Sequence, residues 1–239
     1  IGYKARETVT VRAMDARVNI LGRQARYDGL AVNSEAMLNG DLNINNTTIR
    51  GTVATDDNLS TSNRAGSAIS KAQAINDATQ YTGVRAIVNK TSVAGNQAVQ
   101  QVALDSDNYI VINDEIISGF TVSANDADGA LINAINAIAN ETGVIARLDQ
   151  DLNLVLEAED GRNIEIEVNG AASNLGLLAE TYAGSITLQS RSAIDMVQTD
   201  DGAERLGIYS DAAGGRTILG VNSNFSVETI DITTRQGAN

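Results

Sequence analysis

A pattern of twenty residues occurs twice in this chain. Residues 70–89 read SKAQAINDATQYTGVRAIVN, and residues 130–149 read ALINAINAIANETGVIARLD. Each copy contains an Ile-Asn pair, a later Thr-Gly-Val, one further residue and Ala. A sequence that repeats itself in this way is typical of a protein that builds one structural unit more than once. We therefore expect two copies of the same module.

Each copy predicts a short amphipathic helix that ends at a glycine. The first helix is expected over residues 67–81 and the second over about 127–141, after an N-cap at Asp126. Gly83 and Gly143 follow where a C-terminal cap glycine belongs, and a strand follows each glycine. The residues that share the buried face recur every three or four positions. They are Ala68, Ala72, Ile75 and Thr79 in the first helix, and Leu131, Ile135 and Ile138 in the second.

A β-hairpin is expected before each helix. The segment around Asn45-Asn46 reads as a tight turn between two strands, since Asn tolerates the left-handed conformation. Ile112-Asn113 followed by Ile117 repeats the spacing of Ile44-Asn45 followed by Ile49. Each unit is therefore a hairpin, a loop, a helix, a cap glycine and a strand, and the loop is longer in the first copy. A single helix cannot bury its apolar face alone, so it must pack on a sheet.

The repeated positions define the candidate functional residues. We interpret the isoleucines as core, the glycines as helix caps and the threonines as the entry to a strand. The asparagine after each isoleucine is open to two interpretations: it hydrogen-bonds a turn backbone, or it lines a site. The complete set is Ile44, Asn45, Ile49, Ile75, Asn76, Thr82, Gly83 and Val84 in the first copy, and Ile112, Asn113, Ile117, Ile135, Asn136, Thr142, Gly143 and Val144 in the second.

The rest of the chain reads mainly as β-structure. Residues 7–12 alternate as a strand does, and the segments 143–149, 152–159 and 162–168 are expected to form an antiparallel run. Two related pieces, 172–177 and 203–208, each predict one helical turn closed by a glycine. The fold class expected is α+β, with mainly antiparallel β subdomains and one short helix packed on a sheet in each repeat module.

Composition removes most enzyme classes. The 239 residues include no Cys, His, Pro or Trp. Thiol nucleophiles, Ser-His-Asp triads and ordinary zinc sites are therefore excluded. The net charge of −13 disfavours nucleic acid and anionic membranes as partners. We expect no catalytic residue, no cofactor and no metal.

The remaining chemical candidates fail on their patterns. Asp105-Ser106-Asp107 begins like a calcium loop, but Tyr109 and Ile116 occupy ligand positions. A glycosidase carboxylate pair would need aromatic walls for sugar stacking, and only 3% of the residues are aromatic.

The repeat resembles the Ile-Asn motif in the variable middle region of bacterial flagellins and hook-associated proteins. The tail, from Ile230 to Thr234 and then Gly237-Ala238-Asn239, resembles the point where flagellins re-enter their C-terminal helix. This resemblance covers about residues 41–178 and the last 14. It implies a structural, surface-exposed part of the extracellular flagellar filament that serves motility. It also implies assembly with other flagellin subunits through terminal helices that this chain lacks, lateral contacts between outer domains, and a monomeric isolated fragment.

The resemblance also implies a domain order. Residues 1–38 and 180–239 are expected to meet in a discontinuous base subdomain near the filament core. Residues 39–95 and 96–179 would form the first and second repeat modules. By analogy with the family, O-linked sugars are expected in the exposed loop at Thr55, Ser60, Thr61 and Ser62.

Two alternatives remain open from the sequence. A hook-associated or filament-cap protein shares the Ile-Asn motif. An adhesin or glycan-binding module would instead expose Tyr109, Phe120 or Tyr182 in a concave patch.

Overall fold

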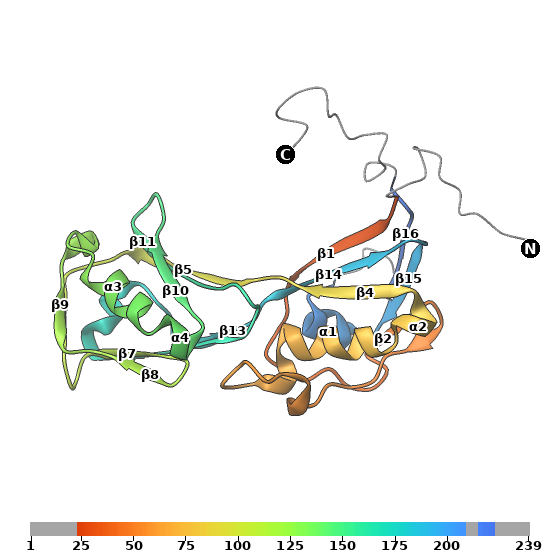
Figure 1. The fold of residues 1–239 in the computed structure, drawn as a ribbon, viewed down its shortest axis with the longest axis horizontal. Helices are drawn as coiled ribbons and strands as arrows, with labels where there is room; N and C mark the ends of the chain where they lie inside the picture. The colour runs from red at the N-terminus through yellow and green to blue at the C-terminus, as the bar shows by residue number, and fades with distance from the viewer. Residues whose placement is uncertain (1–22, 209–214, 223–239) are drawn as a thin grey trace, which may run out of the picture.

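The computed structural model describes residues 23–208 and 215–222, and it has two lobes joined by two extended segments (Figure 1). We call residues 23–88 and 185–222 the terminal lobe, and residues 91–182 the inserted lobe. The expected strand at 7–12 and the tail resemblance at 230–239 lie outside the described residues. Both lobes combine short helices with several small antiparallel sheets, so the expected α+β class is confirmed.

The terminal lobe contains two sheets and three α-helices. One sheet has the order β1-β14-β4 and the other β16-β15-β2-β3, and every pairing is antiparallel. The strands are β1 (Ala25–Ala31), β2 (Leu42–Ile44), β3 (Thr47–Thr48), β4 (Val84–Val88), β14 (Ser185–Ser190), β15 (Ile194–Gln198) and β16 (Arg216–Leu219). The helices are η1 (Ala54–Asp56), η2 (Arg64–Gly66), α1 (Ala68–Asp77), α2 (Thr79–Thr82) and α5 (Asp200–Leu206).

The inserted lobe repeats this plan. Its sheets have the orders β10-β11-β5 and β13-β12-β7-β8, and a small pair β6-β9 is added. The strands are β5 (Thr91–Ala98), β6 (Val102–Leu104), β7 (Tyr109–Ile112), β8 (Glu115–Ile117), β9 (Phe120–Val122), β10 (Ile145–Leu148), β11 (Asn153–Ala158), β12 (Ile164–Asn169) and β13 (Glu180–Tyr182). The helices are η3 (Ala124–Asp126), α3 (Ala130–Ala137), α4 (Ala139–Thr142) and η4 (Gly170–Leu175).

The second module is nested inside the first. In the inserted lobe a short turn joins β10 to β11, whereas in the terminal lobe the whole inserted lobe stands between β4 and β14. The registers agree: Ala86 pairs with Leu188 as Ala146 pairs with Leu156. Each module thus consists of an edge strand, a hairpin, a helix and four further strands, and a helical turn lies between the third and the fourth of these strands. The related pieces 172–177 and 203–208 are that turn in the two copies.

Each lobe has its own hydrophobic core. One cluster gathers buried residues from 93 to 177, and the other gathers buried residues from 25 to 86 and from 183 to 208. Both cores consist mostly of Ala, Val, Ile and Leu, as the scarcity of aromatic residues requires. The sequence-based division separates 39–95 from 1–38 and 180–239. Buried residues from 25–37, 42–86 and 183–208 share one cluster, and Val93 belongs to the other.

Two local predictions need correction. Strand β12 pairs with β13 and β7 rather than with β11, so residues 143–168 are not one antiparallel run. Helix α3 begins at Ala130, and its N-cap is Gly129, three residues after the expected N-cap at Asp126. The Asp126 carboxylate still caps the helix, because it accepts hydrogen bonds from the Leu131 and Ile132 amides at 2.9 and 3.0 Å.

Candidate functional site: the Ile-Asn module

The asparagine of each hairpin turn joins three elements of its module. Asn45 and Asn46 have φ values of 50° and 63°, and Asn113 and Asp114 have 47° and 71°. These are the left-handed conformations of a two-residue type I′ turn, which Asn and Asp adopt more readily than other side chains. The expected hairpin turns are therefore present in both copies.

Two side-chain hydrogen bonds of the turn asparagine are the same in both lobes. Asn45 Nδ2 donates to the Thr82 carbonyl at 2.7 Å, and its Oδ1 accepts from the Asp195 amide at 2.9 Å. Asn113 Nδ2 donates to the Thr142 carbonyl at 2.8 Å, and its Oδ1 accepts from the Glu165 amide at 2.8 Å. One amide group therefore ties the hairpin turn to the end of the helix and to a strand that is 52 or 150 residues away.

The second asparagine of each copy fastens the helix to the following strand. Asn76 donates to the Ala86 carbonyl at 3.0 Å and accepts from the Ala86 amide at 2.8 Å. Asn136 makes the same pair of bonds with Ala146, at 3.1 and 2.7 Å. The side-chain amide thus offers the strand a donor and an acceptor, as a neighbouring strand would.

The Thr-Gly-Val segment turns the chain from helix to strand. Gly83 and Gly143 have φ values of 68° and 72°, which a glycine adopts without a Cβ penalty. Thr82 and Thr142 are buried, and each hydroxyl accepts a hydrogen bond from the amide two residues later at 3.1 Å. This contact satisfies an amide that neither the helix nor the strand would bond.

The apolar members of the motif are buried. Fully or almost fully buried side chains are Ile44, Ile49, Ile75, Val84, Ile112, Ile117, Ile135 and Val144. Burial of one such side chain stabilises the fold by roughly 1.5–3 kcal/mol. The motif residues therefore form the packed inner side of each module.

One repeated glycine escaped the sequence analysis. Gly29 of β1 and Gly95 of β5 occupy matching places. A Cβ on Gly29 would lie 2.9 Å from the Ile186 carbonyl oxygen, and a Cβ on Gly95 would lie 3.5 Å from the Leu154 carbonyl oxygen. The backbone amide of the next residue donates to the glycine that closes the helical turn of the same module. Leu30 donates to the Gly207 carbonyl and Asn96 to the Gly176 carbonyl, both at 2.9 Å. Single glycines in strands carry little signal, and only the alignment of the two lobes connects these two.

The two repeat helices differ in charge at one fully buried position. Leu131 of α3 is fully buried, and the matching residue of α1 is Lys71, which is also fully buried. Lys71 Nζ donates to the Asn33 carbonyl at 2.7 Å. Burial, and to a smaller extent the nearby Arg205 charge, lower the pKa of Lys71 to about 7, although Glu35 and Asp41 act in the opposite direction.

The residues expected to carry O-linked sugars have different environments. Thr55 and Thr61 are exposed. Ser60 is buried and accepts a hydrogen bond from the Asn163 amide at 2.9 Å, and the Ser62 hydroxyl oxygen is also buried. In the folded protein only Thr55 and Thr61 are accessible candidates.

Neither a metal site nor an aromatic patch emerges from the described residues. Within residues 23–208 and 215–222, no three acidic side chains are grouped to hold an ion. Tyr109, Phe120 and Tyr182 are partly buried, and the last two pack against the core of the inserted lobe. Among the described helices, none has the length and apolar character needed to cross a membrane.

The comparisons with known proteins agree with this geometry. A family described as the flagellin hook IN motif matches residues 111–160, the second copy of the pattern. Flagellin A of Helicobacter pylori is 32% identical over 130 residues, 54% of this chain and 25% of that protein. Flagellin B of Helicobacter pylori is 26% identical over 178 residues, 69% of this chain and 33% of the relative.

A third relative extends the match to another species. Flagellin A of Helicobacter felis is 33% identical over 140 residues, 53% of this chain and 26% of the relative. The chain thus spans between a quarter and a third of the length of these three relatives. The second module thus matches the flagellin hook IN motif, and the chain is similar to Helicobacter flagellins over about half to two thirds of its length.

Proposed function

We propose that this chain forms an outer, surface-exposed part of a bacterial flagellar filament and serves motility as a structural component outside the cell. One observation carries the proposal. Both amide atoms of Asn45, Asn76, Asn113 and Asn136 bond backbone groups of their own module. No motif amide atom is left over for a ligand, so the motif builds a scaffold. The flagellin relatives and the hook IN match support the same role.

The inserted lobe would point away from the filament axis. The described segments nearest both chain ends meet in the terminal lobe, where Gln24 and Asn222 form an isolated bridge. If the chain ends lead to the filament core through terminal helices, as the resemblance implies, the inserted lobe lies farthest from it. The described residues up to Val88 and from Ser185 onward would then form one inner unit, since their buried side chains share a core.

The inserted lobe also carries the excess charge. Residues 91–182 contain 15 Asp and Glu and 2 Lys and Arg, whereas the rest of the chain contains 15 of each kind. An outer lobe of this composition repels the same lobe on a neighbouring filament, and the repulsion weakens as salt screens it. Lateral contacts between outer domains would therefore depend on ionic strength.

The proposed role involves other flagellin subunits and no catalysis. The family is structural, which suggests a protein that is not an enzyme. We expect the isolated fragment to be monomeric, because the polymerising helices would lie outside it. O-linked sugars, where present, would sit on Thr55 and Thr61. The hook-associated and adhesin alternatives are not favoured, since the relatives are flagellins and the candidate aromatics are partly buried.

Immunogold labelling of the parent bacterium tests the proposal. Antibodies are raised against the 239-residue chain and applied to intact flagella. Gold particles along the whole filament are expected. Labelling confined to the hook junction or to the filament tip would instead support a hook-associated or cap protein. Labelling of the cell body alone would contradict both assignments.

A further inference from the structure

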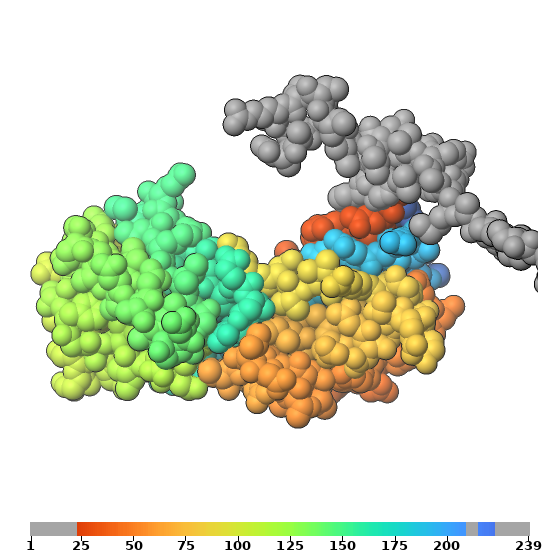
Figure 2. Space-filling view, viewed as in Figure 1, coloured from red at the N-terminus to blue at the C-terminus, as the bar shows by residue number. Residues whose placement is uncertain are grey.

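The terminal lobe has a long loop that the inserted lobe lacks. Residues 53–66, which include η1 and η2, lie between the first hairpin and α1. In Figure 1 this loop, in brown-orange, extends below the connecting segments toward the inserted lobe. Figure 2 shows orange residues of the terminal lobe against green residues of the inserted lobe at the same place. We call residues 53–66 the strut.

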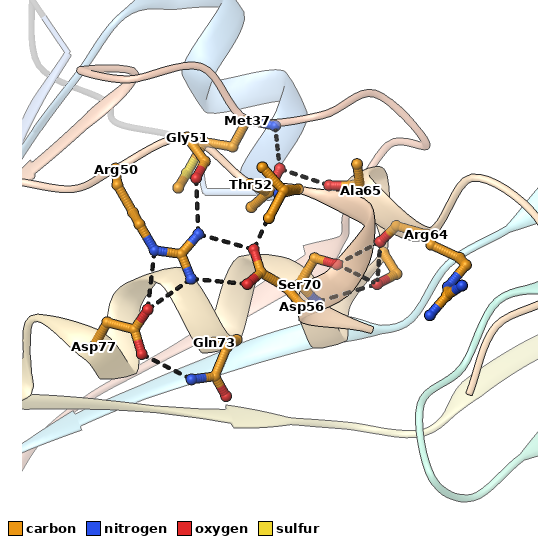
Figure 3. Close-up of polar contacts among 12 residues, drawn as sticks. Met37, Arg50, Gly51, Thr52, Asp56, Arg64, Ala65, Ser70, Gln73 and Asp77 are labelled. Carbon is orange, nitrogen blue, oxygen red and sulfur yellow. Dashed lines mark hydrogen bonds and ion pairs between the residues drawn. The ribbon is translucent and has the colours of Figure 1, made fainter. Parts of the chain in front are cut away.

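The root of the strut is held by one arginine. Figure 3 shows the Arg50 guanidinium between Asp56 of the strut and Asp77 of α1. Its nitrogens donate to Asp56 at 2.8 and 2.9 Å, to Asp77 at 2.6 and 2.9 Å, and to the Gly51 carbonyl at 2.9 Å. A guanidinium bonded in this fork geometry fixes direction as well as distance. The strut therefore leaves the terminal lobe at a set angle.

Further contacts anchor the other end of the strut. Thr52 Oγ1 donates to the Ala65 carbonyl at 2.6 Å and accepts from the Met37 amide at 2.9 Å. The Ser67 and Ser70 hydroxyls both donate to the Arg64 carbonyl. The strut is thus fastened where it leaves the lobe and where it returns to α1.

The tip of the strut is closed on itself. Asp57 is fully buried, and its Oδ1 accepts from the Leu59 and Ser60 amides at 2.8 and 3.0 Å. Arg64 Nε donates to the Asp57 carbonyl at 2.6 Å and closes the loop from the other side. A polar loop bonded in this way keeps its shape without a hydrophobic core of its own.

This tip binds one residue of the inserted lobe. The Asn163 amide donates to Ser60 Oγ at 2.9 Å, and Asn163 Nδ2 donates to the Ser62 and Asn63 carbonyls at 3.1 and 3.3 Å. The Asn163 carbonyl in turn accepts from Asn113 Nδ2 at 3.3 Å. The strut therefore docks directly on the Ile-Asn network of the second module.

The other copy shows that this contact is not needed to build a module. The register of β15 and β12 places Ala193 at the position of Asn163, one residue before Ile194 and Ile164. Asn163 is 1% exposed, whereas Ala193 is exposed. The terminal lobe thus folds with nothing covering this position, and the asparagine serves the contact between lobes.

We propose that the strut fixes the orientation of the inserted lobe relative to the terminal lobe. The lobes are joined through residues 88–91 and 182–185, and a ribbon of two strands can bend and twist. The strut adds a third attachment, made by a segment of the terminal lobe that is not part of this ribbon. It holds Asn163, next to Arg162, whose carbonyl accepts from Thr91 Oγ1 at 2.7 Å, and so limits bending and twisting of the ribbon. The inference concerns this chain alone and holds whether or not the chain belongs to a filament.

Distance measurement between spin labels tests the strut. The chain has no cysteine, so Tyr81→Cys and Asp151→Cys place one label on an exposed residue of each lobe. Double electron–electron resonance on this protein should give one narrow distance peak. In the labelled background, Asn163→Ala should lose that peak to a broad distribution. Ser60→Ala removes one of the three hydrogen bonds of the contact and should broaden the peak. Thr61→Ala changes an exposed residue of the same loop and should keep the peak.

Two results would overturn the proposal. One is a peak as narrow in Asn163→Ala as in the unsubstituted protein. The other is a broad distribution in the unsubstituted protein itself. Far-UV circular dichroism on every variant shows whether both lobes are folded. If Asn163→Ala fails to fold, Ser60→Ala decides, because it removes only a hydroxyl group on the terminal lobe.

Discussion

The turn asparagine of the inserted lobe should be the most sensitive polar residue of the module. Asn113 is 3% exposed and makes three side-chain hydrogen bonds, to the Thr142 carbonyl, the Asn163 carbonyl and the Glu165 amide. Asn113→Ala removes all three. The Thr142 carbonyl keeps a bond from Arg162 Nη1 at 3.3 Å, so the other two groups lose a partner while buried.

The magnitude follows from these contacts. Each buried group left without a partner costs about 1–3 kcal/mol, and an alanine in the left-handed conformation adds roughly 1–2 kcal/mol. Asn113→Ala should therefore lower the free energy of unfolding by about 3–8 kcal/mol. Asn113→Gly loses the same bonds without the conformational cost, so it should be less destabilising by roughly 1 kcal/mol.

Urea unfolding followed by circular dichroism measures these differences. Asp114→Ala is the matched control, because Asp114 has a φ of 71° in the same turn, so this substitution should show the conformational cost. Equal destabilisation by Asn113→Ala and Asp114→Ala would refute the reasoning, since the asparagine bonds would then contribute nothing.

Three further predictions follow from the contacts. Lys71→Leu should stabilise the protein most at and below pH 7. The pKa of Lys71 is about 7 in the folded protein and 10.5 without burial, so between these pH values the unfolded state binds more protons and the wild-type protein gains stability as pH rises. The gain should shrink as pH rises toward 10.5; a gain independent of pH in urea unfolding would contradict this. Arg147 and Lys90 lower the pKa of Glu157 to about 2, so this carboxylate contributes stability above about pH 4.5 that is lost as pH falls toward 2. Glu157→Gln should flatten the acid side of the stability profile, and an unchanged profile would count against the ion pairs. Gly29→Ala should lower the melting temperature more than Gly95→Ala, because the added Cβ lies 2.9 Å from a carbonyl oxygen in the first case and no closer than 3.3 Å in the second.

Local structure was predictable where the signal is local. Gly83 and Gly143 end their helices in the left-handed conformation, and Asn45 and Asn113 turn their hairpins, as the sequence indicates. These residues act within a few positions of themselves, so the pattern of neighbours suffices. The buried isoleucines follow from the same periodicity.

The long-range arrangement was not predictable from this sequence. Strand β1 pairs with β14, with Ala25 opposite Ser190, and no local pattern indicates a partner so far along the chain. Strand β12 looks like the continuation of β11 but pairs with β7 and β13. The role of Asn163 was missed for the same reason, since its partners lie about 100 residues away in the other lobe.

The nested order has a consequence for how such a chain can grow. The terminal lobe tolerates an entire second module between β4 and β14, and the matching place in the inserted lobe is the protruding β10–β11 turn (Figure 1). Asp151 and Leu152 are exposed there, and the hairpin below them is already closed by its own ladder. A foreign domain whose ends lie close together could be spliced in at this turn. Repeated insertion at such a turn would lengthen the protein outward one module at a time. The strands of the terminal lobe, which lead to the two chain ends, would stay unchanged.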